Sequence, residues 1–477
     1  MSADLILALK PEVVRTLDAM HVAIKVIDAL VLLRREFGLQ RVKPLWPVRM
    51  DLVEQLFNPA KRNGLDRILN GDAKRFLDDA PNFFETFDGP EETPDTLAAA
   101  RRRLLVTLAD EKRVERAVKR LKGYPVIAYV EEVPNVLAPD YDLFTDPRES
   151  QDPRIPPVAQ IPVGKSDIGA WAYARLKLPE DWRDLTLNNI AVLDSGCEAA
   201  HPALGQRVDF ADDRSRRDPS GHGTFVTASI AGRYSSVEPT PFDPDKVYDV
   251  PQGVLPKSRV WVANVMSERP VVVNGVAQYP LDFGRYSKFL GQIADARRRK
   301  AGRLSAIQVV NLSLGAQTPS SAHAEDIREL LNAGVIVVAA AGNRPEDWKR
   351  DTPTMYPAAL KDVISVGALS YAKSREDSLW WRTCTSLPKE SKRKSALDVL
   401  APGDVILSAY PMEGPSEVKF SAWLSGTSMA APFVTAVAAV LCHQGITDRK
   451  KILELLAPKG SKTNLGAPVL NTNFKKK

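Results

Sequence analysis

Cysteine and histidine are scarce in this chain, and their scarcity limits the kinds of site that it can hold. The 477 residues include five histidines and three cysteines, which are Cys197, Cys384 and Cys442. Three widely separated cysteines form neither a disulfide framework nor a zinc-binding pattern, so we predict no metal site and no cofactor. Calcium stays open as an alternative, because Asp243, Asp245 and Asp249 lie close together in the sequence.

A long uninterrupted apolar run is also missing. The most apolar helix candidate, residues 13–33, is interrupted by Arg15, Asp18, His21, Lys25 and Asp28. We therefore expect a core or interface helix there, and no membrane partner. The first residues, MSADLILALKPEVV, show neither the basic segment nor the small-residue cleavage site of an export signal. Together with the few cysteines, this predicts a cytoplasmic location.

Charge of one sign is not in large excess. The net charge of +6 arises from short basic clusters at residues 101–103, 297–300 and 475–477. Clusters of this size are usually solvated faces, so we expect no nucleic-acid partner. The hydrophobic fraction of 44% and the charged fraction of 26% are typical of a soluble globular protein. The length predicts two or three domains.

We expect residues 1–135 to form an N-terminal α+β region that is mainly helical. Apolar spacing predicts a helix at residues 13–36 and shorter helices at residues 51–57 and 65–77. A strand–helix–strand unit is predicted at residues 104–108, 110–121 and 126–130, and residues 5–9 are a candidate strand. Residues 136–165 are rich in proline and charge, which predicts an exposed linker and a domain boundary.

The remaining residues, 166–470, alternate between apolar strands and helices. Strands are expected at residues 189–193, 259–265, 307–314, 335–340 and 363–368, and helices at residues 221–231, 281–300 and 326–332. This alternation predicts an α/β fold, a doubly wound and mostly parallel sheet with helices on both faces. Sites in such folds gather at the carboxyl ends of strands, which is where Asp194 and Asn343 stand.

The stretch GTSMAAP, residues 426–432, places a serine at the start of a long apolar helix. The pattern predicts that Ser428 lies in the first helical turn. It also places Pro432 in that turn, where a missing N–H costs little. A serine at this place either caps the helix or acts as a nucleophile whose oxyanion the helix N–H groups stabilise. The stretch alone leaves both interpretations open.

Three other residues bear on this choice. Asp194 follows an apolar strand in IAVLDSG and either orients an imidazole or caps its own turn. His222 lies between two glycines in GHGT and is either a general base or a helix-capping residue. Asn343 follows a strand in VVAAAGN and either donates to an oxyanion or occupies an ordinary turn.

Taken together, these motifs resemble those of the subtilisin-like serine peptidases. The motifs IAVLDSG, GHGTFVTASIAG, NLSLG, VVAAAGN, YPAAL, VISVGAL, LDVLAPG and GTSMAAP follow the order of that family over residues 165–460. The resemblance implies a serine endopeptidase that acts on protein or peptide substrates. It implies the roles of nucleophile, general base, orienting acid and oxyanion donor for Ser428, His222, Asp194 and Asn343, respectively.

The same resemblance implies where a substrate binds. Ser313, Leu314 and Gly315 would pair with extended substrate backbone. Ala340, Ala341 and Gly342 would line the primary specificity pocket.

Three positions near these motifs depart from the family pattern. Phe225 and Phe433 stand where many members have a further histidine, but neither position is catalytic. Arg344 directly follows the oxyanion asparagine. It either favours an acidic or polar side chain before the scissile bond or points to solvent.

Residues 114–136, VERAVKRLKGYPVIAYVEEVPNV, resemble the end of a subtilisin propeptide. This implies an inhibitory domain whose tail, around residues 135–145, occupies the active cleft like a product. We therefore expect a latent enzyme that cuts itself between about residues 135 and 165. Two alternatives stay open. One is a latent protease of a bacterial regulatory or defence system, switched on by a regulatory protein at the N-terminal region. The other is a non-catalytic interaction platform.

Overall fold

The structure is a computed structural model of the chain, which folds as two compact units. It describes residues 3–10, 20–44, 70–79, 103–133, 142–144, 171–237, 248–273, 276–344, 352–370, 379, 382–411, 419–458 and 467–473. The first unit comprises Met1–Pro134 together with Leu290–Asp295 and Ser320–Glu329, and the second unit comprises the other residues.

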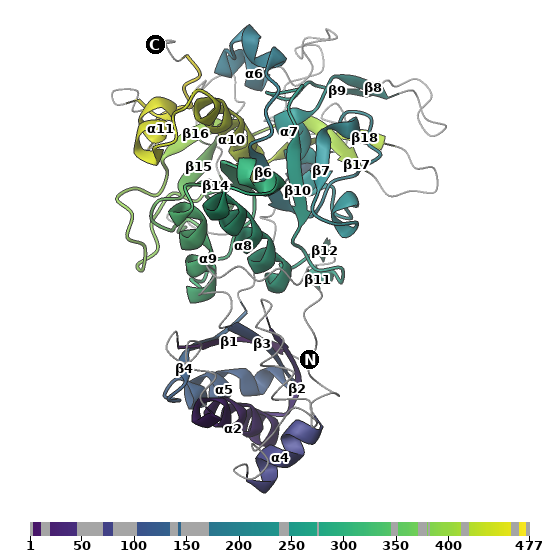
Figure 1. Cartoon of the computed structure of the whole chain (residues 1–477). Coiled ribbons are helices and arrows are strands. Elements are labelled where there is room, and N and C mark those ends of the chain that lie inside the picture. Colours follow the sequence, from purple (N-terminus) through teal and green to yellow (C-terminus); the bar gives the residue numbers. More distant parts are fainter. Residues whose placement is uncertain are drawn as a thin grey trace. The chain divides into compact units, whose positions relative to one another are not determined.

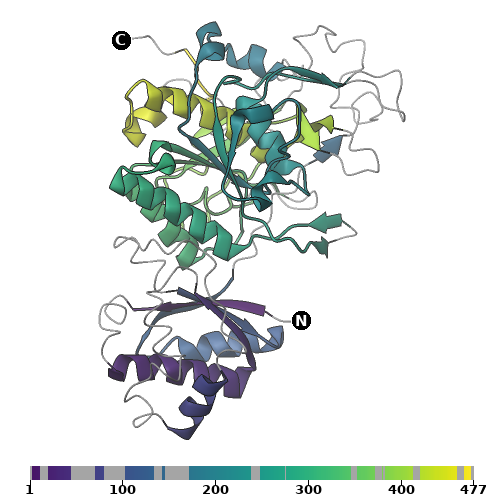
Figure 2. The same ribbon diagram turned by 45° about the vertical axis from the view of Figure 1, so that its right-hand side comes forward.

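The first unit is built on a four-stranded antiparallel sheet in the order β2-β3-β1-β4. Its elements along the chain are β1 (Ala3–Leu9), α2 (Met20–Phe37), β2 (Leu39–Pro44), α4 (Gly71–Asp78), β3 (Arg103–Leu108), η5 (Glu111–Arg113), α5 (Val114–Leu121) and β4 (Ile127–Glu132). Figures 1 and 2 show α2 and α5 on one face of this sheet. Apolar side chains of the strands and helices form one buried cluster between them. The unit is therefore a split βαβ arrangement with its own core.

Most expected elements of this unit are present. The predicted strands at residues 5–9, 104–108 and 126–130 are found as β1, β3 and β4. Strand β2 was not predicted, because Pro44 was taken as a break, but it lies at the edge of the sheet, where a proline is tolerated. The predicted helix at residues 51–57 lies outside the described residues. So does the linker at residues 136–165, apart from Asp142–Phe144.

A cluster of charges also lies within the first unit. The Arg103 side chain is fully buried, and its guanidinium pairs with Glu325 and Asp326, each at 2.8 Å. The Glu131 carboxylate accepts hydrogen bonds from the backbone N–H groups of Ser321 and Ala322, at 2.9 and 3.0 Å. Residues of β3 and β4 are thus tied to the Ser320–Glu329 segment of the same unit by ion pairs and a helix cap.

The second unit contains a seven-stranded parallel sheet in the order β16-β15-β14-β13-β6-β10-β7. Its strands along the chain are β6 (Ile190–Asp194), β7 (Val208–Phe210), β10 (Val260–Asn264), β13 (Val309–Leu312), β14 (Ile336–Ala340), β15 (Ile364–Leu369) and β16 (Val399–Pro402). All described side chains of the central strands β6, β13 and β14 are buried, as expected for a sheet covered on both faces. The predicted α/β fold is confirmed (Figure 1).

The remaining elements are helices and short sheets, and two of these helices extend into the segments Leu290–Asp295 and Ser320–Glu329 of the first unit. The helices are α6 (Trp171–Leu176), η7 (Glu180–Asp184), η8 (Gly205–Arg207), η9 (Arg214–Arg216), α7 (His222–Ala231), α8 (Phe283–Arg299), η10 (Arg303–Ala306), α9 (Ser321–Asn332), α10 (Thr427–His443) and α11 (Arg449–Leu456). The short sheets pair β8 (Ser235–Val237) with β9 (Tyr248–Val250), β11 (Val271–Val273) with β12 (Val276–Gln278), and β17 (Ile406–Pro411) with β18 (Lys419–Ser425) and β5 (Asp142–Phe144). Among the described residues, no helix is long and apolar enough to cross a membrane.

Candidate active site

The predicted catalytic residues lie at element ends of the second unit. Asp194 is the last residue of β6, His222 is the first residue of α7, and Ser428 is the second residue of α10. Asn343 follows β14 and is 3% exposed, whereas the other three are fully buried. The N-caps of the two helices are Gly221 and Gly426, so neither His222 nor Ser428 is a capping residue.

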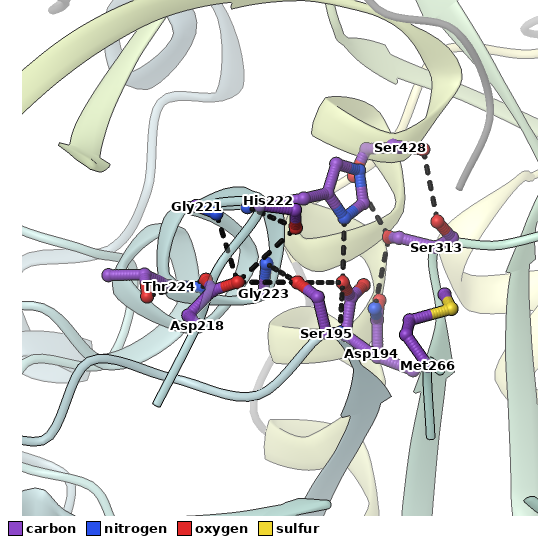
Figure 3. A network of polar contacts seen from close by, with 12 residues as sticks. Asp194, Ser195, Asp218, Gly221, His222, Gly223, Thr224, Met266, Ser313 and Ser428 are labelled. Carbon is purple, nitrogen blue, oxygen red and sulfur yellow. Dashed lines mark hydrogen bonds and ion pairs between the residues drawn. The ribbon is translucent and has the colours of Figure 1, made fainter. Parts of the chain in front are cut away.

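Asp194 and His222 form a buried pair. The distance from Asp194 Oδ1 to His222 Nδ1 is 2.7 Å, and the carboxylate therefore fixes which ring nitrogen carries the proton. Burial lowers the pKa of His222, but the charge of Asp194 and its hydrogen bond raise it more, so this pKa lies above its usual value. Figure 3 shows the imidazole lying between Asp194 and Ser428.

A second carboxylate, which the sequence interpretation missed, supports this pair. Ser195 Oγ lies 2.7 Å from Asp218 Oδ1 and 3.2 Å from Asp194 Oδ1, and it accepts a hydrogen bond from Gly223 N at 2.9 Å. The Ser195 hydroxyl thus links the two aspartates (Figure 3). The signal in the sequence was an aspartate four residues before the histidine, in DPSGH.

Asp218 also holds the start of α7. Its Oδ2 atom accepts from the N–H and the hydroxyl of Thr224, both at 2.6 Å, and its Oδ1 atom accepts from Gly221 N at 2.9 Å. Burial raises the pKa of Asp218, the hydrogen bonds from Thr224 and Ser195 lower it, and the charge of Asp194 raises it; the net shift is upward. Gly221 has a φ of +76°, a conformation that suits glycine and lets the chain turn sharply into His222.

Ser428 is held by an exchange of hydrogen bonds with Ser313. The prediction that Pro432 lies in the first turn of α10 is wrong, because the helix begins at Thr427 and Pro432 falls in its second turn. A proline there has no N–H to donate to the Ser428 carbonyl. Ser313 Oγ donates to that carbonyl instead, at 2.9 Å, and Ser428 Oγ donates to the Ser313 carbonyl at 3.2 Å.

Asn343 is oriented by the residue that precedes Ser428. Its side-chain oxygen accepts from Thr427 N at 3.0 Å and from Thr427 Oγ1 at 2.8 Å. Thr427 Oγ1 also accepts from Gly342 N at 3.1 Å. With the amide oxygen directed at Thr427, the NH₂ group of Asn343 occupies the other branch of the amide, as an oxyanion donor would require.

The six predicted substrate-binding residues form two segments that follow neighbouring strands. Ser313, Leu314 and Gly315 come after β13, whereas Ala340 ends β14 and is followed by Ala341 and Gly342. Leu314, Ala340 and Ala341 are at most 1% exposed as whole residues. Phe225 and Phe433 are core residues packed in the main apolar cluster.

A buried Asp–His pair and a serine in the first turn of a buried helix, at one edge of a parallel sheet, are what a serine hydrolase requires. The model of the subtilase family matches residues 188–446. The chain is 30% identical over 292 residues to the major intracellular serine protease of Bacillus subtilis (strain 168), covering 58% of this chain and 77% of that protein. It is 29% identical over 333 residues to subtilisin E of the same organism, covering 69% of this chain and 68% of that protein. The chain therefore belongs to the subtilase family and is a serine endopeptidase.

A solved structure shares the fold. The crystal structure of fervidolysin from Fervidobacterium pennivorans, described as a keratinolytic enzyme related to subtilisin, matches with a TM-score of 0.51 and 22% identity. The match covers 77% of this chain and 55% of that one, so the chain spans about half the length of fervidolysin. At this identity the likeness shows the fold alone.

Proposed function

We propose that this serine endopeptidase cleaves peptide bonds through Asp194, His222 and Ser428. The observation that carries the proposal is the 2.7 Å contact between the buried Asp194 and His222, beside a serine held in the first turn of α10. His222 takes the proton of Ser428 Oγ as that oxygen attacks the scissile carbonyl carbon. Asp194 stabilises the imidazolium that results.

Asn343 stabilises the charge that develops on the substrate oxygen. Its NH₂ group and the backbone N–H of Ser428, at the positive end of α10, are the donors in this proposal. His222 then gives its proton to the leaving amine and an acyl enzyme forms on Ser428. Water, activated by His222 in the same way, releases the new carboxyl end and restores the hydroxyl.

The test compares wild type with Ser428→Ala on a casein substrate and with a fluorophosphonate probe. Wild type should hydrolyse casein and become labelled at Ser428, as located by peptide mass spectrometry. The variant should lose about 10⁵- to 10⁶-fold in turnover, because the nucleophile is gone. If wild type hydrolyses casein no faster than Ser428→Ala and is not labelled by the probe, the result would favour a non-catalytic interaction platform.

We further propose that the N-terminal region holds the enzyme latent until the chain is cut. Two observations support this. Strand β5 (Asp142–Phe144) pairs antiparallel with β18, where Asp142 is the partner of Ser425, three residues before Ser428. The segment Ser320–Glu329, which lies within the family match, shares the first unit with the N-terminal residues and is tied to Arg103 and Glu131. The end of β18 next to the nucleophile thus pairs with chain from the expected linker.

Self-cleavage is tested by expressing wild type and Ser428→Ala and measuring their masses over time. We expect wild type to be cut between about residues 135 and 165 and the variant to stay intact. Mixing processed wild type with the variant shows whether the cut also occurs between molecules. An intact wild type with full activity would contradict latency. An intact and inactive wild type that a partner protein switches on would support the partner-activated alternative.

We also propose that the enzyme acts in the cytoplasm and needs no cofactor. The similarity to the major intracellular serine protease of Bacillus subtilis supports the location. Of the three calcium candidates, Asp243 and Asp245 lie outside the described residues and Asp249 lies in β9. Dialysis against EDTA should leave both activity and the Tm of the wild-type protein unchanged. A fall in both, reversed by added calcium, would show that a calcium site exists.

A further inference from the structure

Met355 lies between the two segments that are predicted to bind substrate. A Cβ atom placed on Gly342 would be 2.5 Å from Met355 Cγ and 2.7 Å from its Sδ. A Cβ atom placed on Gly315 would be 2.8 Å from Met355 Cβ and 3.3 Å from its Sδ. Both glycines therefore present their bare α-carbons to the same methionine side chain, which is itself partly exposed.

The backbone around Met355 is fixed from both sides. Met355 N donates to the Ala341 carbonyl at 2.8 Å. Tyr356 and Ala316 exchange two hydrogen bonds, Tyr356 N to Ala316 O at 2.8 Å and Ala316 N to Tyr356 O at 2.9 Å. Because the main chain bridges the two segments, the Met355 side chain can leave the space between them only by changing its rotamer.

The same two segments hold the nucleophile. Ser428 Oγ donates to the Ser313 carbonyl, at the start of one segment, and Gly342 N, at the end of the other, donates to Thr427 Oγ1. The sequence predicts that Ala340, Ala341 and Gly342 line the primary specificity pocket, so we expect the substrate side chain before the scissile bond to lie against these segments. Gly342 has a φ of +100°, so a larger residue at this position would be strained. The close contact between this segment and Met355 therefore requires glycine.

We infer that Met355 fills the space for the substrate side chain that precedes the scissile bond and restricts the enzyme to small residues there, such as glycine, alanine and serine. This inference rests on the proposed function, because it assumes attack by Ser428. A larger side chain must push the thioether aside in a place bounded by backbone. Differences of this steric kind discriminate substrates by about 10- to 200-fold.

The experiment uses a series of succinyl-Ala-Ala-Pro-X-p-nitroanilides with X as glycine, alanine, leucine, phenylalanine or glutamate. Wild type should show kcat/KM for alanine at least about 10-fold above that for phenylalanine. In Met355→Gly the ratio of phenylalanine to alanine should rise at least about 10-fold, because the space is opened. The matched control, Met355→Leu, keeps the volume and should keep the wild-type ratio.

A second measurement does not depend on the variants folding. Peptidyl diphenyl phosphonates that carry alanine or phenylalanine before the phosphorus atom inactivate wild type at rates that should differ in the same direction. A wild type that reacts equally fast with both, or a Met355→Gly variant with an unchanged ratio, would overturn the inference while the Ser428-dependent activity stands. A wild type that hydrolyses no substrate faster than Ser428→Ala does would instead overturn the proposed function. A preference for glutamate would assign the selection to Arg344.

Discussion

Helices α7 and α10 both begin after a glycine at the carboxyl edge of the same sheet, but their first turns have different partners. At α7 the Asp218 carboxylate accepts from Gly221 N and Thr224 N. At α10 the first N–H, that of Thr427, donates to the neutral side chain of Asn343. The N–H groups at the start of α7 therefore donate to a negative charge, whereas the first N–H group of α10 donates to a neutral amide.

This difference fits the two roles that we propose. A negative charge is stabilised at a helix N-terminus, and Asp218 supplies one at α7, where His222 must stay fixed. A carboxylate beside Ser428 would repel the oxyanion that forms there during attack. An amide can accept from Thr427 with its oxygen and donate to the oxyanion with its nitrogen, so Asn343 serves both needs.

The largest effect is expected when the start of α10 receives a carboxylate, as the start of α7 has in Asp218. Asn343→Asp can still accept from Thr427, but it has no NH₂ group and adds negative charge next to the oxyanion. We expect kcat to fall at least as far as for loss of one oxyanion donor, about 10²–10³-fold, with a smaller change in KM. Steady-state kinetics on the best p-nitroanilide substrate would measure both constants.

Asn343→Ala is the matched variant, since it removes the donor without adding charge. Its kcat should lie between that of wild type and that of Asn343→Asp. Equal losses in the two variants would mean that charge at this position does not matter. A wild-type kcat in Asn343→Ala would remove Asn343 from the oxyanion site.

The opposite change removes the carboxylate from α7. Asp218→Asn loses a charge that contributes to the raised pKa of His222. His222 must be neutral to accept the serine proton, so activity falls as pH drops through this pKa. The variant should therefore lose about 10-fold in kcat and shift the acid limb of its kcat/KM profile to lower pH. A pH-rate profile between about pH 5 and 9 measures this shift.

Asp212→Asn is the control for that experiment. Asp212 is another aspartate at the same edge, and its carboxylate binds Ser215 and Arg285. A merely structural effect of losing a hydrogen-bonded carboxylate would slow both variants without moving either acid limb. An unshifted limb in Asp218→Asn would show that Asp218 does not act through His222.

The sequence predicted the residues whose motifs combine a strand end or helix start with a small flanking residue. Asp194, His222, Asn343 and Ser428 each stand in such a motif, and the structure brings Asp194 and His222 into contact and orients Asn343 at the helix start of Ser428. The parallel sheet followed from the alternation of apolar strands and helices, whose buried strands are apolar on both faces.

What escaped prediction depends on contacts between residues far apart in the chain. The link from Ser195 to Asp218 needs the α7 turn to fold back on β6, which no local pattern specifies. Met355 is an ordinary apolar residue in the sequence, and only the pairing of its segment with Ala341 and Ala316 places it between two glycines. Pro432 was predicted in the first turn of α10 and lies in the second, because helix starts are uncertain by one or two residues from sequence alone.

The smallest effect that we predict concerns the hydrogen bond from Ser313 to the carbonyl of Ser428, which stabilises the start of α10. Ser313→Ala leaves this buried carbonyl without its hydroxyl donor and should destabilise the protein by about 1–3 kcal/mol. Pro432→Ala restores a backbone N–H four residues after Ser428, which can take over as donor. The double variant, built in an inactive Ser428→Ala background to prevent self-cleavage, should therefore be more stable than Ser313→Ala alone. Urea unfolding of the four proteins measures the coupling. Additive effects of the two substitutions would show that the Ser313 hydroxyl does not stand in for the N–H that Pro432 lacks.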